Sequence, residues 1–79
     1  MIPVQSSQIK SVGYDHEKET LYVEFLDDSV YAYFDIPEGH YSKMIGFGAK
    51  PGKYFNNNIR GSYTYTGIKQ VVNDGRLEV

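Results

Sequence analysis

Apolar and polar residues alternate along three stretches in the first half of the chain. The clearest covers residues 20–26, where leucine, valine and phenylalanine occupy every second position, the pattern of a half-buried strand. Further strands are expected over residues 9–14 and 30–34. The polar segments 15–19 and 27–29 between them are short. Two short connections in succession predict an antiparallel meander.

The apolar spacing then changes to that of a helix. A first helix is expected to begin near Pro37, because proline lacks only an N–H that the first turn does not use, and Glu38 suits the positive end of the helix dipole. We place its cap at Asp35 or Ile36 and its end at the glycines 46 and 48. Its apolar stripe is expected at Tyr41, Met44 and Ile45, extended by Phe47.

A second helix is predicted from Pro51 to about Arg60, with Phe55 and Ile59 facing the core and Gly61 as its C-cap. Four polar residues of this segment fall at positions i, i+3, i+4 and i+7, which places them on one continuous stripe. They are Lys53, Asn56, Asn57 and Arg60.

The end of the chain reads as extended over residues 63–65 and then as a hairpin over 68–79, around an Asn-Asp-Gly turn. An isolated two-stranded ribbon is marginal in water, so it must pack on the body or on another subunit. The fold class is therefore α+β: a three-stranded antiparallel meander packed with two short helices, plus a C-terminal β-hairpin or strand. We expect a domain of residues 1–65 and a tail of residues 66–79, through which a homo-oligomer could form.

The composition narrows the class of protein. Seventy-nine residues form one domain with a small core, which must rely on eight tyrosines and four phenylalanines. Without cysteine, no disulfide framework or thiolate metal site is possible. No apolar run has the length of a membrane span, and no signal sequence is recognisable. We expect a soluble, cytoplasmic protein with no membrane contact, metal or cofactor.

The net charge of −2 conceals an uneven distribution. Residues 14–38 contain eight acids and one base, whereas residues 41–73 contain five bases and no acid. Two interpretations are open. The basic helices could lie over the acidic sheet edges and be neutralised by them, or the basic half could form an anion-binding face.

The candidate functional stretch is residues 50–65, which combines four aromatics, three consecutive asparagines and three cations without an acid. A helix starting at Pro51 would present free N–H groups, and Gly52 would permit close approach of an anion. The alternative is an ordinary solvated helix start. Tyrosines 54, 63 and 65 are expected to be exposed, and Arg60 is the best single candidate for a contact with phosphate. The candidate ligand-binding residues are Lys50, Lys53, Tyr54, Asn56, Asn57, Arg60, Tyr63 and Tyr65.

A pair of tyrosines and a pair of histidines are further candidates for a functional role. Tyr31 and Tyr33 share one face of a strand, either as core residues or as a platform on which bases stack, and the platform requires that the rings do not both lie beneath a helix. His16 and His40 are far apart in the sequence and are expected to be solvated. Since no nucleophile, base and acid are combined in a recognisable pattern, we do not expect an enzyme.

The order of several motifs resembles that of the KTSC domain family over about Gln5 to Tyr65. The motifs are Ser6-Ser7-Gln8-Ile9, Val12-Gly13-Tyr14-Asp15, Tyr31-Ala32-Tyr33, Ile36-Pro37 and Gly52-Lys53-Tyr54-Phe55-Asn56. This family is named after the C-terminal extension of some lysyl-tRNA synthetases, and it also occurs as small stand-alone bacterial and phage proteins. The attachment to a synthetase implies a role in RNA binding, and the resemblance supplies no catalytic activity that could be carried over to this chain.

Together, these patterns favour a non-catalytic binding module for a phosphate-bearing nucleic-acid ligand. The ligand would be single-stranded RNA or a small signalling nucleotide, the latter as in a phage-type protein that sequesters a nucleotide. The negative net charge of the chain limits its affinity for a long polyanion, and this favours a small nucleotide in a formed pocket. The alternative is a protein–protein interaction module that acts through the Tyr-rich surface and the C-terminal tail.

Overall fold

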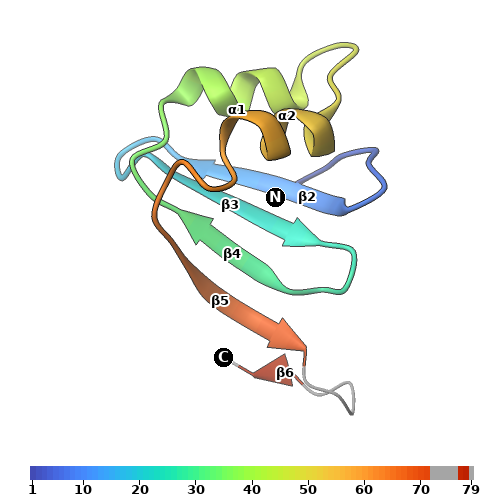
Figure 1. The fold of residues 1–79 in the computed structure, drawn as a ribbon, viewed down its shortest axis with the longest axis vertical. Helices are drawn as coiled ribbons and strands as arrows, with labels where there is room; N and C mark the ends of the chain where they lie inside the picture. Colours follow the sequence, from blue (N-terminus) through green and yellow to red (C-terminus); the bar gives the residue numbers. More distant parts are fainter. Residues whose placement is uncertain (72–76, 79) are drawn as a thin grey trace.

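Antiparallel strands in chain order and two helices on one side of them make up the protein (Figure 1). The computed structural model describes residues 1–71 and 77–78, with side chains as far as Ile68. The sheet order is β1-β2-β3-β4-β5-β6. The elements are β1 Ile2–Pro3, β2 Ile9–Asp15, β3 Thr20–Phe25, β4 Val30–Tyr33, α1 Glu38–Ile45, α2 Pro51–Asn58, β5 Tyr65–Val71 and β6 Leu77–Glu78.

The predicted meander is confirmed in strands β2, β3 and β4. Val12 pairs with Val23, and Leu21 pairs with Tyr33, so that their side chains bury one face of the sheet. The tight connections follow from aspartate chemistry, because an Asp carboxylate can accept hydrogen bonds from backbone N–H groups two or three residues ahead. Asp15 does so in the β2–β3 turn, at 3.0 and 3.2 Å.

Helix α1 begins one residue later than expected. Pro37 is the N-cap residue, with an extended backbone and no side-chain cap, in place of the predicted Asp35 or Ile36. Met44 is fully buried, as its place on the apolar stripe predicts. Ile45 is 37% exposed, and the expectation for Phe47 is wrong: the helix ends at Ile45, and Phe47 lies fully exposed in the following loop.

Helix α2 begins at Pro51 as predicted and ends at Asn58, slightly before the expected Arg60. The Phe55 carbonyl accepts the N–H groups of both Ile59 and Arg60, each at 2.9 Å, which tightens the last turn. Gly61 follows in the left-handed region at φ +81°, beyond the cap position itself.

The apolar side of α2 closes the core. Phe55 and Ile59 are 2% and 0% exposed. The Phe55 ring meets the rings of Phe25 and Tyr33 edge to face, with centroid distances of 5.8 and 5.1 Å. Such contacts bind the helix to the meander with large aromatic areas.

Strand β5 extends the sheet on the far side of β4 (Figure 1). It begins at Tyr65, which is earlier than the predicted strand, and Tyr65 pairs with Tyr33. Strand β6 pairs with the end of β5 through Val71 and Leu77. The predicted turn at residues 73–75 lies outside the described residues, and the role of the tail between subunits stays a prediction.

No helix in the described part of the chain is long and apolar enough to cross a membrane.

The packing of α2 predicts that replacing two phenylalanines by alanine has very different effects on stability. Phe55→Ala should lower the free energy of unfolding by about 3–5 kcal/mol, because it opens a cavity between α2 and the sheet. Phe47→Ala makes the same chemical change at a fully exposed position and should alter stability by less than about 0.5 kcal/mol. Urea denaturation followed by circular dichroism measures both. Equal losses would contradict the assignment of Phe55 to the core.

Candidate ligand-binding surface along helix α2

Three of the four residues of the predicted polar stripe lie on the outer side of α2, whereas the fourth, Arg60, lies beyond the end of the helix. Because Phe55 and Ile59 are fixed in the core, the remaining side chains of the helix must point elsewhere. Lys53, Asn56 and Asn57 are all exposed. The stripe is therefore available to a ligand.

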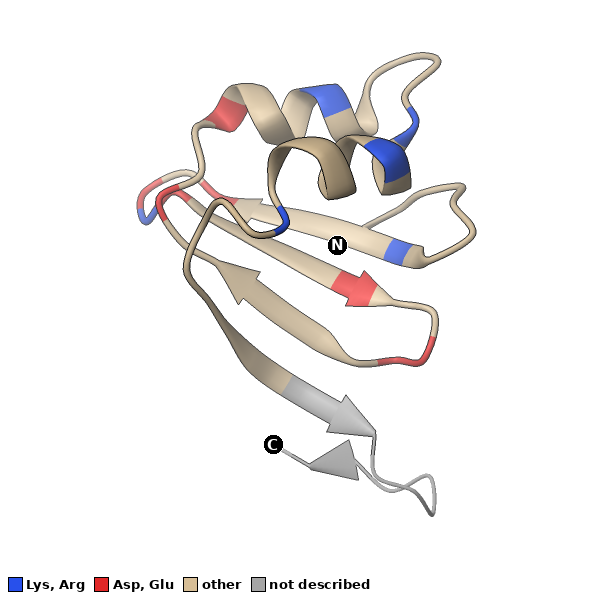
Figure 2. Ribbon diagram, in the orientation of Figure 1, with Lys and Arg blue, Asp and Glu red and all other residues tan. Residues whose placement is uncertain are grey.

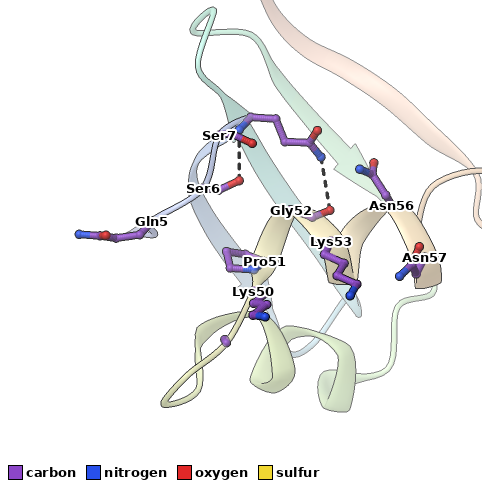
Figure 3. A pocket seen from close by; sticks show the side chains of 11 residues that line it. Gln5, Ser6, Ser7, Lys50, Pro51, Gly52, Lys53, Asn56 and Asn57 are labelled. Carbon is purple, nitrogen blue, oxygen red and sulfur yellow. Dashed lines mark hydrogen bonds between the residues drawn. The ribbon is translucent and has the colours of Figure 1, made fainter.

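A hollow of about 470 Å³ lies between the start of α2 and the segment before β2 (Figure 3). We call it the lysine hollow. It brings together four of the predicted site residues, and none of its described lining residues is acidic. The lining residues are Gln5, Ser6, Ser7, Gln8, Ala49, Lys50, Pro51, Gly52, Lys53, Asn56 and Asn57.

In the segment before β2, the Ser6 side chain fixes the segment itself and the Gln8 side chain joins it to α2. The Ser6 hydroxyl accepts the N–H groups of Gln8 and Ile9, each at 3.1 Å. The Gln8 amide donates to the Gly52 carbonyl at 3.3 Å (Figure 3). A Cβ at position 52 would lie 2.7 Å from the Ser6 oxygen, so the walls approach this closely only because residue 52 is glycine.

A smaller hollow of about 210 Å³ adjoins the lysine hollow on the side of α1. It is lined by Lys43, Lys50, Lys53, Tyr54, Asn57 and Asn58. Lys50, Lys53 and Asn57 belong to both hollows. The two lysines thus stand between two recesses, where an anion can approach them from more than one direction.

Within the described residues, no ion pair joins a cation of the two helices or their flanking loops to an acid of the sheet. The ion pairs recorded in the described part of the chain join Lys10 with Asp28 and His16 with Glu38. Neither pair involves a basic residue of α1, α2 or their flanking loops. Figure 2 shows these bases on the helices and on the loops beside α2, while most acids lie at the turns between strands. Of the two interpretations of the charge pattern, internal neutralisation is not what the described residues show.

Tyr54 and Tyr63 are not the exposed aromatics that the sequence predicted. Both are half-buried against the core, and both hydroxyls contact His40. The Tyr54 oxygen lies 2.6 Å from His40 Nδ1, and the Tyr63 oxygen lies 3.2 Å from Nε2. His40 is likewise half-buried, not solvated. The three side chains link α1, α2 and the segment before β5.

A third recess, of about 670 Å³, opens where the end of α2 faces β4 and β5. We call it the aromatic cleft. Tyr33 lies at its base, 6% exposed beneath Phe55, and burial raises the pKa of its hydroxyl above the ordinary value. Tyr31 is half-buried in the wall, and Tyr65 is 59% exposed. Both residues of the predicted tyrosine pair therefore border the cleft, but Tyr33 is a buried core residue and Tyr31 is half-buried.

The eight predicted residues thus separate into three groups. Lys50, Lys53, Asn56 and Asn57 line the lysine hollow. Arg60 and Tyr65 line the aromatic cleft. Tyr54 and Tyr63 hold His40. Gln8 lines both cavities but was not among the predicted site residues, although it belongs to the motif Ser6-Ser7-Gln8-Ile9.

The described residues contain no group of three His, Asp or Glu side chains placed to hold a metal ion.

The fold and the sequence together define the family. The sequence model of the KTSC domain family matches residues 5–63, so the chain belongs to this family. Its structure is similar to the crystal structure of a KTSC domain protein from Yersinia pestis, with a TM-score of 0.76 and 30% identity over 84% of this chain and 92% of that one.

A curated relative is the lysine–tRNA ligase of Nostoc punctiforme, which is 31% identical over 65 residues. The match covers 82% of this chain but only 11% of the ligase. The similarity therefore concerns a small part of that enzyme.

The close approach at residue 52 predicts that two glycine-to-alanine substitutions change the stability of the protein in opposite directions. Gly39 and Gly52 are each the second residue of a helix, but a Cβ at position 39 would meet nothing within 4 Å. Gly39→Ala should stabilise the protein by about 0.4–1 kcal/mol. Gly52→Ala should destabilise it by about 1–3 kcal/mol, because Ser6 can move aside only by losing two hydrogen bonds.

Thermal and urea unfolding of both variants measure these changes. Stabilisation by Gly52→Ala would show that the lysine hollow is wider than described.

Proposed function

We propose that this KTSC domain binds a phosphate-bearing nucleic-acid ligand without catalysing a reaction on it. Lys50, Lys53, Asn56 and Asn57 of the lysine hollow would hold the phosphate. The observation that carries this proposal is a pair of lysines in a hollow, with neither an ion-pair partner nor an acidic lining residue among the residues that the structure describes.

The chemistry of the lining suits a phosphate group. Lysine ammonium and asparagine amide groups are hydrogen-bond donors, and phosphate oxygens are acceptors. Gly52 and Lys53 also lie in the first turn of α2, where backbone N–H groups lack helical partners. Contacts of this kind position a nucleic acid without reading its sequence.

Two sources of the phosphate fit the same donors, single-stranded RNA and a small signalling nucleotide. The relative named as a lysine–tRNA ligase supports RNA. The net charge of −2 supports a compact ligand, because it weakens attraction to a long polyanion. A phage-type protein that sequesters a nucleotide in the cytoplasm is the second form of the proposal.

The proposed role is binding and not catalysis, because the lining of the lysine hollow supplies hydrogen-bond donors for a phosphate and His40 is not among its lining residues. Both ring nitrogens of His40 instead contact tyrosine hydroxyls, which link α1, α2 and the segment before β5. The proposal assigns no cofactor and no metal.

A protein partner is the second candidate, and one observation favours it. Ile2, Ile45 and Phe47 are exposed apolar residues, the last of them completely. Ile2 and Ile45 line a common recess of about 240 Å³. A homo-oligomer formed through residues 66–79 would add a further contact of this kind.

The first test is charge removal at the lysine hollow. In a fluorescence anisotropy titration with a fluorescein-labelled single-stranded RNA, the double change Lys50→Gln and Lys53→Gln should weaken binding about 10-fold or more. It should also reduce the slope of log K against log salt by about one to two. Lys18→Gln, a matched change in the exposed β2–β3 turn, should have little effect.

A cyclic dinucleotide in the same titration separates the two ligand sources. Tight binding that tolerates salt identifies a small nucleotide, whereas steep salt dependence identifies RNA. Equal losses from Lys18→Gln and from the double variant would contradict the assigned surface, and binding of neither probe would contradict the proposed function.

A further inference from the structure

The aromatic cleft adjoins the lysine hollow, and the phosphate-binding role does not account for it. Gln8 lines both cavities. Arg60, in the wall of the cleft, donates from Nη1 to Oδ1 of Asn56 in the hollow, at 3.4 Å. The two cavities therefore meet beside the last turn of α2.

The wall of the cleft is a row of rings supported from below. Tyr65 stacks on Tyr33, with a centroid distance of 5.3 Å and an interplanar angle of 29°. Tyr31 lies 5.9 Å from Tyr65 and 5.8 Å from Phe25. Because Tyr33 is held beneath Phe55, this row has a rigid base while Tyr65 stays 59% exposed. A planar ring can stack on such a surface.

The polar groups at the cleft decide which part of a nucleotide belongs there. Among the described lining residues, Arg60 is the cation and Asp27 is the acid. The Asp27 carboxylate accepts the Ser29 hydroxyl at 2.6 Å and the Ser29 N–H at 3.0 Å. These hydrogen bonds lower the Asp27 pKa and keep the group ionised. A fixed carboxylate opposes a phosphate within the cleft, whereas a base with amino donors can lie beside it.

The two cavities are close enough for one ligand to occupy both. Asn56 stands in the lysine hollow, and Arg60 stands in the cleft wall just beyond the end of α2. Because the two side chains are in hydrogen-bond contact, no intervening side chain separates the hollow from the cleft at this point. One nucleotide can therefore reach both cavities.

We propose that the aromatic cleft binds an unpaired nucleobase, whose phosphate lies at the lysine hollow. This inference rests on the proposed function and adds that the ligand must present a free base face. Single-stranded RNA and small nucleotides meet this condition. Duplex RNA does not, because its base faces are covered by their neighbours.

The test compares substitutions at Tyr65 in an anisotropy titration with a fluorescein-labelled oligoadenylate. Tyr65→Leu should weaken binding about 5- to 150-fold, the range typical of losing one stacked base. Tyr65→Phe should bind nearly as the original protein does, because the ring stacks and the hydroxyl does not. Tyr22→Leu is the matched control, since Tyr22 alternates with the buried Leu21 and Val23 and lies on the opposite face of the sheet.

Tripolyphosphate, which has no base, separates this inference from the proposed function. Its competition for the site should be weakened by the Lys50→Gln and Lys53→Gln pair and left unchanged by Tyr65→Leu. If the lysine variant weakens oligoadenylate binding but Tyr65→Leu does not, the base site is overturned and the phosphate site stands. If neither oligoadenylate nor adenosine monophosphate binds, both are overturned.

A paired oligoadenylate and adenosine monophosphate provide two further comparisons. The same oligoadenylate paired with its complement should bind at least 10-fold more weakly, and equal affinity would overturn the base site. Competition by adenosine monophosphate at concentrations similar to the oligonucleotide would identify a small nucleotide as the source, whereas much weaker competition would identify RNA. In either case the base site is supported only if Tyr65→Leu reduces the binding.

Discussion

The packing of α2 against the sheet is the contact on which the rest of this structure depends. Phe55 and Ile59 are almost wholly buried, and Phe55 meets rings from both β3 and β4. Once these two side chains are fixed, the rotation of the helix is fixed as well. Lys53, Asn56 and Asn57 must then face outward, so the same contact that completes the core also presents the candidate binding surface.

Each end of α2 borders a different cavity, and the difference follows from what the helix faces there. Its start approaches the polar segment before β2, which Ser6 and Gln8 hold in place, and the resulting hollow is rich in amide, hydroxyl and ammonium groups. Its end approaches β4 and β5, whose tyrosines give the second cavity an aromatic wall. The bases of the helical layer lie apart from the acids at the strand turns (Figure 2). A small negative net charge is thus compatible with a locally positive surface.

Local patterns were sufficient to predict the meander and both helices, because the period of apolar residues and the position of proline act within a few residues. Contacts between distant residues could not be read in this way. Tyr54 and Tyr63 reach His40 across 14 and 23 positions, and no periodicity links them. Tyr31 and Tyr33 share a face of the sheet as expected, yet it is the Tyr33 ring that packs against Phe55 of α2. The stripe on α2 was predictable, whereas the hollow beside it depends on Ser6 and Gly52, whose approach is a property of the fold.

The central claim is that one side of α2 and the segment facing it form the ligand surface. The most direct measurement is a nuclear magnetic resonance titration of the ¹⁵N-labelled protein with oligoadenylate. It follows the side-chain amide signals of Gln8, Asn56 and Asn57 and the backbone signals of residues 52–60. If this surface binds the ligand, these signals should shift together and saturate, while the backbone signals of the β2–β3 turn stay in place. Shifts confined to that turn or to the loop around Phe47, or no shifts at all, would contradict it.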